Sequence, residues 1–315
     1  MRLTPASDAT YRLVARERQV RELRCALFTH GLAAAVECRH SGCAFARWYE
    51  ARHNLPRSKS RNKRWIAFFN ATLPGAALQQ ELLASFPQLG VVFDDSLWVG
   101  FADDPKRLVD WDGVAESVER SYALHGLTDL AVLMRCPEIE WLGRLLILMR
   151  AKRTRFLLTR FFLSLRISRF VLMSCVSPPG CWVAQRLYER ISSLIQAKVF
   201  SVEIEDWPAT FLEFDSRLSE LRSCLNIIVD HGWVRRLHPD ALLFYILLCG
   251  LPRERRAAFL EQVCVEGESK PPRWMLQRFW RAQNRCRRWQ KMHTAPNGIG
   301  SRDKVFPRTG SRSRF

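Results

Sequence analysis

The sequence predicts a mainly α-helical protein with many helices and little strand, and three observations support this. Leucine, alanine, arginine and glutamate recur at helical spacing along most of the chain. Short runs that suit β-strands are few. Hydrophobic residues make up 48% and charged residues 25%, which is the composition of a globular protein rather than a disordered one.

The expected helices follow one another along the chain. The first covers residues 11–38, which contain no proline and only Gly31 as a helix breaker. A second carries Leu78 and Leu82 at helical spacing and stops at Pro87. Other segments that allow a helix are 114–124, 141–173, 181–199, 210–229, 239–249 and 252–265. The best strand candidates are 91–93 and 199–204.

The length of 315 residues suits two domains. We expect a helical N-terminal unit over 1–125 that associates with a helical C-terminal unit over 126–293. Residues 294–315 mix glycine, proline, serine and arginine with little to bury, so they are predicted to form a disordered basic tail.

Charge is the unusual property of the chain. The net charge is +18 and the pI is about 10.1, which favours polyanions such as nucleic acid or an anionic membrane face. The charge alternates in blocks: 1–93, 141–202 and 269–315 are basic, whereas 94–140 and 203–268 are acidic. In one interpretation the acidic and basic blocks pair across the fold. In another they are simply solvated faces.

Targeting and cysteine usage predict a soluble cytoplasmic protein. No apolar region of a secretory signal is visible near the N-terminus, and no run of about 18 uncharged apolar residues occurs. The ten cysteines lie mostly in apolar stretches rather than in a short disulfide-dense chain. Free thiols in a reducing cytoplasm are therefore expected.

A basic run followed by aromatic residues forms the first candidate site. Its predicted nucleic-acid contacts are Arg57, Lys59, Arg61, Asn62, Lys63 and Arg64. In a DNA-contacting helix the first turn reaches phosphates and base edges while later turns pack into the domain. Asn70 is expected to end this helix in a left-handed conformation, and Pro74 to open the next. Alternatively, the aromatic residues are core and the basic run is a solvated entry to the helix.

The same stretch resembles the second half of lambda-repressor-like helix-turn-helix domains, because Asn70, Pro74, Leu78 and Leu82 occupy matching places. It departs from that pattern at Arg64, which stands where those domains bury an aliphatic residue. Residues 57–98 also resemble a recurring segment of uncharacterised bacterial proteins, which implies a bacterial origin but no activity.

A second candidate contact surface lies near the C-terminus. Its predicted contact residues are Arg278, Arg281, Arg285, Arg287 and Arg288. Trp274, Phe279, Trp280 and Trp289 are interleaved with them, and no acidic residue occurs between Glu268 and Asp303. Guanidinium groups with aromatic rings suit phosphate contact and base stacking. The alternative is an amphipathic helix that docks its tryptophans on the body while its arginines stay in water.

Residues 141–173 allow one long basic, apolar helix that carries Arg144, Arg155 and Arg166 on one face. The interpretation that we favour is a core helix whose arginines pair with the acidic segment 94–140. The alternative is a helix that lies on an anionic membrane surface.

Enzyme motifs are weak in this sequence. Cys25, His30, Cys38, His40 and Cys43 are numerous enough for zinc but lack the paired spacing of structural zinc sites. Asp103, Asp104, Asp110 and Asp112 suit either Mg²⁺ or helix capping. No GxSxG, glycine-rich phosphate loop or HExxH occurs. We therefore predict no catalytic residue, no metal ligand and no cofactor.

These observations together predict a nucleic-acid-binding regulatory or accessory protein that prefers DNA to RNA. One alternative is a structural protein that docks acidic protein partners through its basic blocks. The other is a peripheral membrane protein attached through 141–173.

Overall fold

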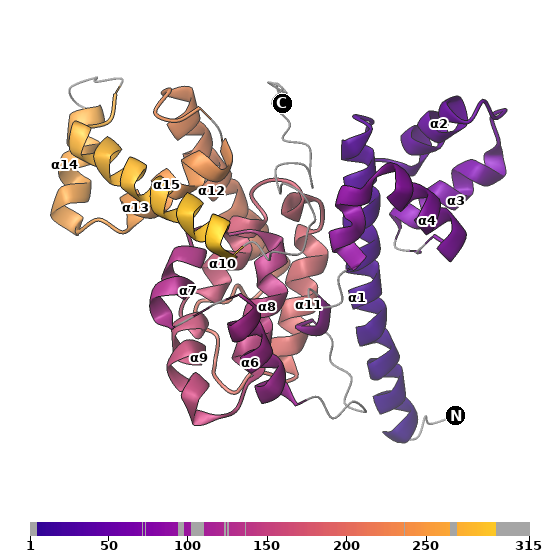
Figure 1. Ribbon diagram of the computed structural model, residues 1–315, viewed down its shortest axis with the longest axis horizontal. Helices are drawn as coiled ribbons and strands as arrows, with labels where there is room; N and C mark the ends of the chain where they lie inside the picture. Colours follow the sequence, from indigo (N-terminus) through magenta and orange to yellow (C-terminus); the bar gives the residue numbers. More distant parts are fainter. Residues whose placement is uncertain are drawn as a thin grey trace.

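The computed structural model describes residues 5–70, 72, 74–93, 98–101, 110–122, 124, 126–135, 137–235, 237–264 and 270–293. Over these residues the chain forms fourteen α-helices and no strand, which confirms the predicted helical fold class (Figure 1). The predicted basic tail lies outside the described residues. No helix within these ranges is long and apolar enough to cross a membrane.

Four helices and a 3₁₀ helix form the N-terminal part. Serine caps begin two of them: the hydroxyl of Ser41 accepts from the Ala44 amide, and that of Ser58 accepts from the Arg61 amide. In Figure 1 the first helix runs along one side of the molecule, and the next three cluster at its upper end. The elements are α1 (Pro5–Ala35), α2 (Gly42–Arg52), α3 (Lys59–Phe69), α4 (Ala76–Ser85) and η1 (Pro87–Phe93).

The two predicted strands are wrong. Residues 91–93 lie in η1, where the carbonyl oxygen of Val92 accepts a 2.6 Å hydrogen bond from the Trp98 indole. Residues 199–204 follow helix α11 (Ala184–Gln196) as irregular chain, and the Val199 amide closes that helix on the Leu194 carbonyl. Both runs bury apolar side chains without a neighbouring strand, because a short apolar run suits a buried turn as well as a strand.

The middle of the chain folds into short helices. Besides α11 these are α6 (Trp111–Ser121), α7 (Leu127–Leu133), α8 (Ile139–Arg150), η2 (Thr154–Phe156), α9 (Leu157–Ser164), α10 (Ile167–Ser174) and η3 (Gly180–Trp182). The single helix predicted over 141–173 is therefore wrong, since the chain divides it into three. Helix α8 is buried throughout residues 141–150, as expected for a helix that is apolar on nearly every side.

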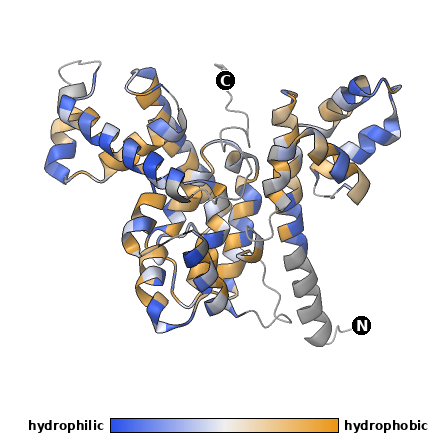
Figure 2. Ribbon diagram, in the orientation of Figure 1, coloured by the Kyte–Doolittle hydropathy of each residue, from blue (hydrophilic) through white to orange (hydrophobic). Residues whose placement is uncertain are grey.

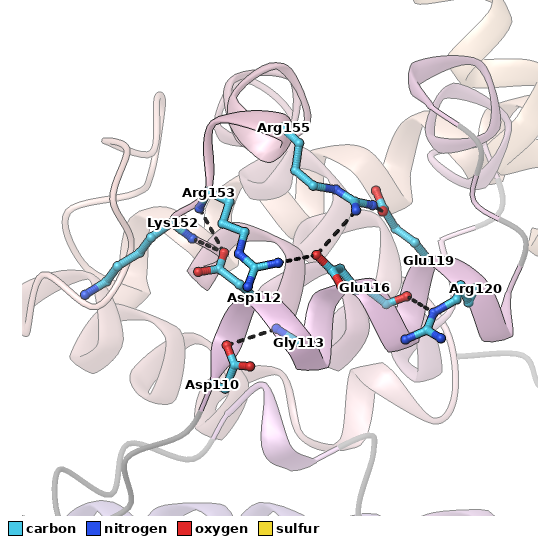
Figure 3. Close-up of polar contacts among 9 residues, drawn as sticks. All are labelled: Asp110, Asp112, Gly113, Glu116, Glu119, Arg120, Lys152, Arg153 and Arg155. Atoms are coloured by element: carbon cyan, nitrogen blue, oxygen red, sulfur yellow. Dashed lines mark hydrogen bonds and ion pairs between the residues drawn. The ribbon is translucent and has the colours of Figure 1, made fainter.

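Distant contacts explain where the predicted helix breaks. After Arg150 the chain becomes extended at Ala151, whose carbonyl oxygen accepts a hydrogen bond from the buried Arg160 guanidinium. The Asp112 carboxylate on α6 accepts from the backbone amides of Lys152 and Arg153, at 2.7 and 2.8 Å (Figure 3). These bonds satisfy backbone groups that would otherwise continue the helix.

Over the described residues, the C-terminal part contains two long helices, of 20 and 21 residues, and two shorter ones. Thr210 caps the first of them by accepting from the Glu213 amide at 3.2 Å. The elements are α12 (Phe211–Asp230), the π-helical turn η4 (Leu237–Ala241), α13 (Leu242–Cys249), α14 (Arg253–Cys264) and α15 (Arg273–His293).

Buried side chains form one continuous core from α1 to α15. Helix α1 packs against α3, η1, η3 and α11, so it connects the N-terminal helices to the middle of the molecule. Helix α15 joins the core through Trp289, whose ring centroid lies 5.3 Å from that of Trp141 on α8. The boundary expected near residue 125 stays a prediction. The cysteines that the structure describes are free thiols.

Candidate nucleic-acid interface

Helix α3 divides its predicted contact residues between solvent and the interior. Arg57, Lys59, Lys63 and Arg64 are exposed, and none of them forms an ion pair with a side chain that the structure describes. Lys59 and Lys63 lie one turn apart, so they share a face. The outer edge of α3 is correspondingly hydrophilic (Figure 2). These four cations are available to an external anion.

Arg61 serves the fold instead, and the Asn62 side chain is turned partly inward. The Arg61 guanidinium donates to the Glu50 carboxylate and to the Pro56 carbonyl, both at 3.1 Å. Glu50 is buried, and it also accepts from the Ser58 amide at 3.0 Å. The side-chain oxygen of Asn62 is buried without a hydrogen-bond partner in the structure. A buried carboxylate without a nearby cation is strongly destabilising. Moving Arg61 away from Glu50 to contact an external ligand would therefore cost free energy.

The aromatic half of this stretch belongs to the core, which confirms the alternative stated for it. Trp65, Phe68 and Phe69 are all buried. The expectation of a left-handed residue at Asn70 is wrong: its φ is −93°, and its amide donates to the Ile66 carbonyl. Helix α4 begins at Ala76, with Gly75 rather than Pro74 at its N-terminal cap. Whether the stretch is related to helix-turn-helix domains stays a prediction.

Helix α2 adds cations that sequence reasoning missed. It packs closely against α3, because Gly42 has no side chain where the Ile66 backbone approaches. Arg47 and Arg52 on α2 and Arg39 just before it are exposed. The sequence did contain a signal for the start of α2, because Ser41 is a favoured residue at the N-terminal cap of a helix. Together these cations make the surface of α2 and α3 basic. Glu50 is turned inward, and the exposed Glu81 carboxylate of α4 contacts α2 at Tyr49.

Helix α15 has an apolar inner face and a basic outer face. Met275, Phe279, Ala282, Cys286 and Trp289 recur at helical spacing, and all are buried. The predicted contact residues Arg281, Arg285, Arg287 and Arg288 are exposed, and Arg278 is half-buried. None of these five forms an ion pair with a described side chain. The alternative of a helix that docks its tryptophans on the body is thus confirmed for Trp289 and wrong for Trp274 and Trp280, which are exposed.

The middle basic block is partly neutralised or buried. Arg153 and Arg155 pair with Glu116 on α6 at 2.6 and 3.3 Å, and Arg155 also pairs with Glu119 (Figure 3). The Arg144 guanidinium lies 4.0 Å from the Tyr122 ring centroid, and that of Arg150 lies 4.3 Å from the Trp111 ring centroid. Of the three arginines expected to pair with the acidic segment, Arg155 does so. Arg144 lies on aromatic rings instead, and Arg166 lies over the Phe162 ring. Lys152, Arg166, Arg169 and Lys198 of block 141–202 are exposed, so this block keeps part of its positive charge at the surface.

Helix α9 carries an exposed apolar patch. Leu157, Leu158, Phe161 and Leu165 are all more than a third exposed. Because α8 is buried, this patch is the part of 141–173 on which the membrane alternative rests. Glu203, Glu205 and Asp206 line the same hollow as Phe161, and such carboxylates are unfavourable beside an anionic bilayer.

The candidate zinc residues do not assemble into a site. No group of three or more His, Cys, Asp or Glu side chains suited to a metal occurs among the described residues. Only His30 and His40 meet, with their Nδ1 atoms 3.2 Å apart and both rings against Trp182 of η3. Asp110 accepts from the Gly113 amide as a helix cap, and Asp112 is occupied as described above. Asp103 and Asp104 lie outside the described residues.

The stacked histidines make stability depend on pH. Burial, with His40 and Arg186 adding to it, lowers the pKa of His30 from 6.5 to about 4, and burial also lowers the pKa of His40. Unfolding exposes imidazoles that bind protons near pH 6.5, so the free energy of unfolding should fall as pH drops from about 6.5 to about 4. Urea titrations at pH 7 and pH 5 measure this loss. His30→Phe, which keeps an aromatic ring, should flatten the dependence, and an unchanged slope would contradict it.

Comparisons with known proteins add no relative: no family model, no curated protein and no solved structure matches this chain.

Proposed function

We propose that the protein binds nucleic acid, DNA in preference to RNA, as a cytoplasmic regulatory or accessory factor. The observation that carries this proposal is the outer face of α15. Its arginines form no ion pair with a described side chain, and all of them except the half-buried Arg278 are exposed. The helix itself contains no acidic residue. Carboxylates reach this helix at Gln283, which donates to Asp240, and at Gln290, which donates to Glu138. Clustered guanidinium groups on its outer face create a field that attracts phosphates.

The basic surface of α2 and α3 supports the same function. Its exposed cations can donate hydrogen bonds to phosphate oxygens. In Figure 1 this surface lies on the opposite side of the molecule from α15. The two surfaces therefore suit a flexible or long polyanion better than one compact site. Two arginines of the middle block are paired with carboxylates of α6, whereas the exposed arginines of α15 and the exposed cations of α3 form no ion pair with a described side chain.

Fluorescence anisotropy with a labelled 20-base-pair DNA duplex tests the proposal. The double substitution Arg281→Gln and Arg285→Gln should weaken binding roughly tenfold or more at 150 mM salt. It should also reduce the slope of log affinity against log salt by about two, since each lost phosphate contact removes about one. The matched control is Arg253→Gln with Arg255→Gln on α14, which are also exposed but flank Glu254. This control should bind like the unmodified protein.

Two results would overturn the proposal. One is failure of the unmodified protein to bind duplex DNA, single-stranded DNA or RNA. The other is displacement of DNA by polyglutamate at equal charge concentration, because a surface built for an acidic protein partner would not distinguish the two polyanions.

A further inference from the structure

Two tryptophans lie on the solvent face of α15, although the helix has an apolar inner face that could hold them. Trp280 is 54% exposed and Trp274 is 39% exposed, while Met275 and Phe279 between them are buried. Leaving such large rings in water forgoes the free energy that burial would provide. Exposed tryptophans among unpaired arginines are therefore the feature of this helix that its packing does not explain.

Helical spacing places each tryptophan at the head of a polar row. Trp274 is followed at intervals of three and four residues by Arg278, Arg281, Arg285 and Arg288. Trp280 is followed in the same way by Asn284 and Arg287. The first row extends about 21 Å along the helix, given a rise of about 1.5 Å per residue. Each ring thus lies on the same surface as side chains that can donate hydrogen bonds to phosphate oxygens.

Duplex and single-stranded nucleic acids use such a surface differently. The bases of a duplex are stacked on one another, so arginines reach its phosphates while aromatic rings find no free base face. In a single strand the bases are accessible, and rings that flank a basic track can stack on them. Exposed Asn284 and Gln277 can also donate to and accept from unpaired base edges.

From this geometry we infer that α15 binds single-stranded nucleic acid, with Trp274 and Trp280 stacking on unpaired bases and the arginine row holding the phosphates. This inference rests on the proposed function and specifies the ligand of its main surface. The shared chemistry is an unpaired base next to a phosphate, which single-stranded DNA and RNA both offer.

Anisotropy with labelled dT20, U20 and a 20-base-pair duplex tests the inference. Trp280→Ala should weaken binding to the single strands roughly tenfold, and Trp274→Ala should do so to a similar extent, because each removes one stacked base. Duplex affinity should change less than about twofold in both variants. Trp280→Phe should recover most of the single-strand affinity, since it keeps a stacking ring. Comparison of dT20 with U20 shows whether the surface prefers single-stranded DNA or RNA.

Phe161→Ala on α9 is the matched control, because it removes another exposed aromatic ring outside the basic surfaces. It should leave all three affinities unchanged, and thermal melting should confirm that every variant is folded. Duplex binding that equals or exceeds single-strand binding, or tryptophan variants that bind dT20 and U20 normally, would overturn the inference while leaving the proposed function intact. Absence of binding to all three ligands would instead remove the proposed function itself.

Discussion

Trp65→Ala should lower the free energy of unfolding by about 3–5 kcal/mol, the cost typical of removing a large buried aromatic side chain. Trp65 joins α2 to α3: its ring centroid lies 4.5 Å from that of Phe45, 5.4 Å from Tyr49 and 5.2 Å from Phe68. Truncation would leave a cavity that these rings fill poorly, since both helices are also held by the Gly42 contact. Urea unfolding followed by far-ultraviolet circular dichroism measures the change.

Ile66→Ala is the control for Trp65, because it shortens the adjacent apolar side chain on the same helix. Ile66 is 38% exposed, so its truncation should cost less than about 1 kcal/mol. An equal loss of unfolding free energy in the two variants would contradict the assignment of Trp65 to the core. Neither variant removes a cation, so nucleic-acid affinity of the folded fraction should stay unchanged.

Arg190→Ala should lower the free energy of unfolding by a similar amount, about 3–5 kcal/mol, because it removes a fully buried, charged hydrogen-bond donor. Both Nε and a terminal nitrogen of Arg190 donate to the Phe101 carbonyl, at 2.8 Å for Nε. The bond fixes the chain near residue 101 to α11. Alanine would leave that carbonyl without its donors and would open a cavity beside it. Arg190→Met, which preserves much of the volume, should lose less than the alanine variant.

Arg222 provides the matched comparison. Its guanidinium also donates two hydrogen bonds to the backbone, to the carbonyls of Val176 and Cys175 at 3.2 and 3.0 Å, but it is only half-buried. Water can replace its bonds, so Arg222→Ala should cost about 1–2 kcal/mol. Chemical denaturation of the two alanine variants side by side separates burial from hydrogen bonding. If Arg222→Ala proved as costly as Arg190→Ala, burial would not be the cause.

Local signals in the sequence were sufficient for the helical class and for several helix ends. Helix α4 ends at Ser85, just before the proline expected to stop it, and Thr210 caps α12 at the start of the segment that predicted that helix. Helix α14 occupies Arg253–Cys264, almost the whole of 252–265. These features depend on neighbouring residues alone, through backbone geometry and capping.

In the candidate sites, too, some features were predictable from the sequence and others were not. The basic, acid-free character of α15 was readable from residue types, because no packing can bring a carboxylate into a helix that has none. Which arginines remain free was not readable. Arg61 turns inward to Glu50, eleven positions earlier, whereas Lys59 and Lys63 face water.

The sequence by itself determined that this chain is helical and basic in separate blocks, since helix propensity and charge are properties of neighbouring residues. Only the tertiary structure decided that 141–173 is three helices, that residues 91–93 and 199–204 form no strand, and that Trp274 and Trp280 remain in solvent. The division of 141–173 depends on a partner far away in the chain, as Asp112 shows by accepting the amides of Lys152 and Arg153. Contacts of that kind carry no local signature, because their free energy exists only once the core brings the partners together.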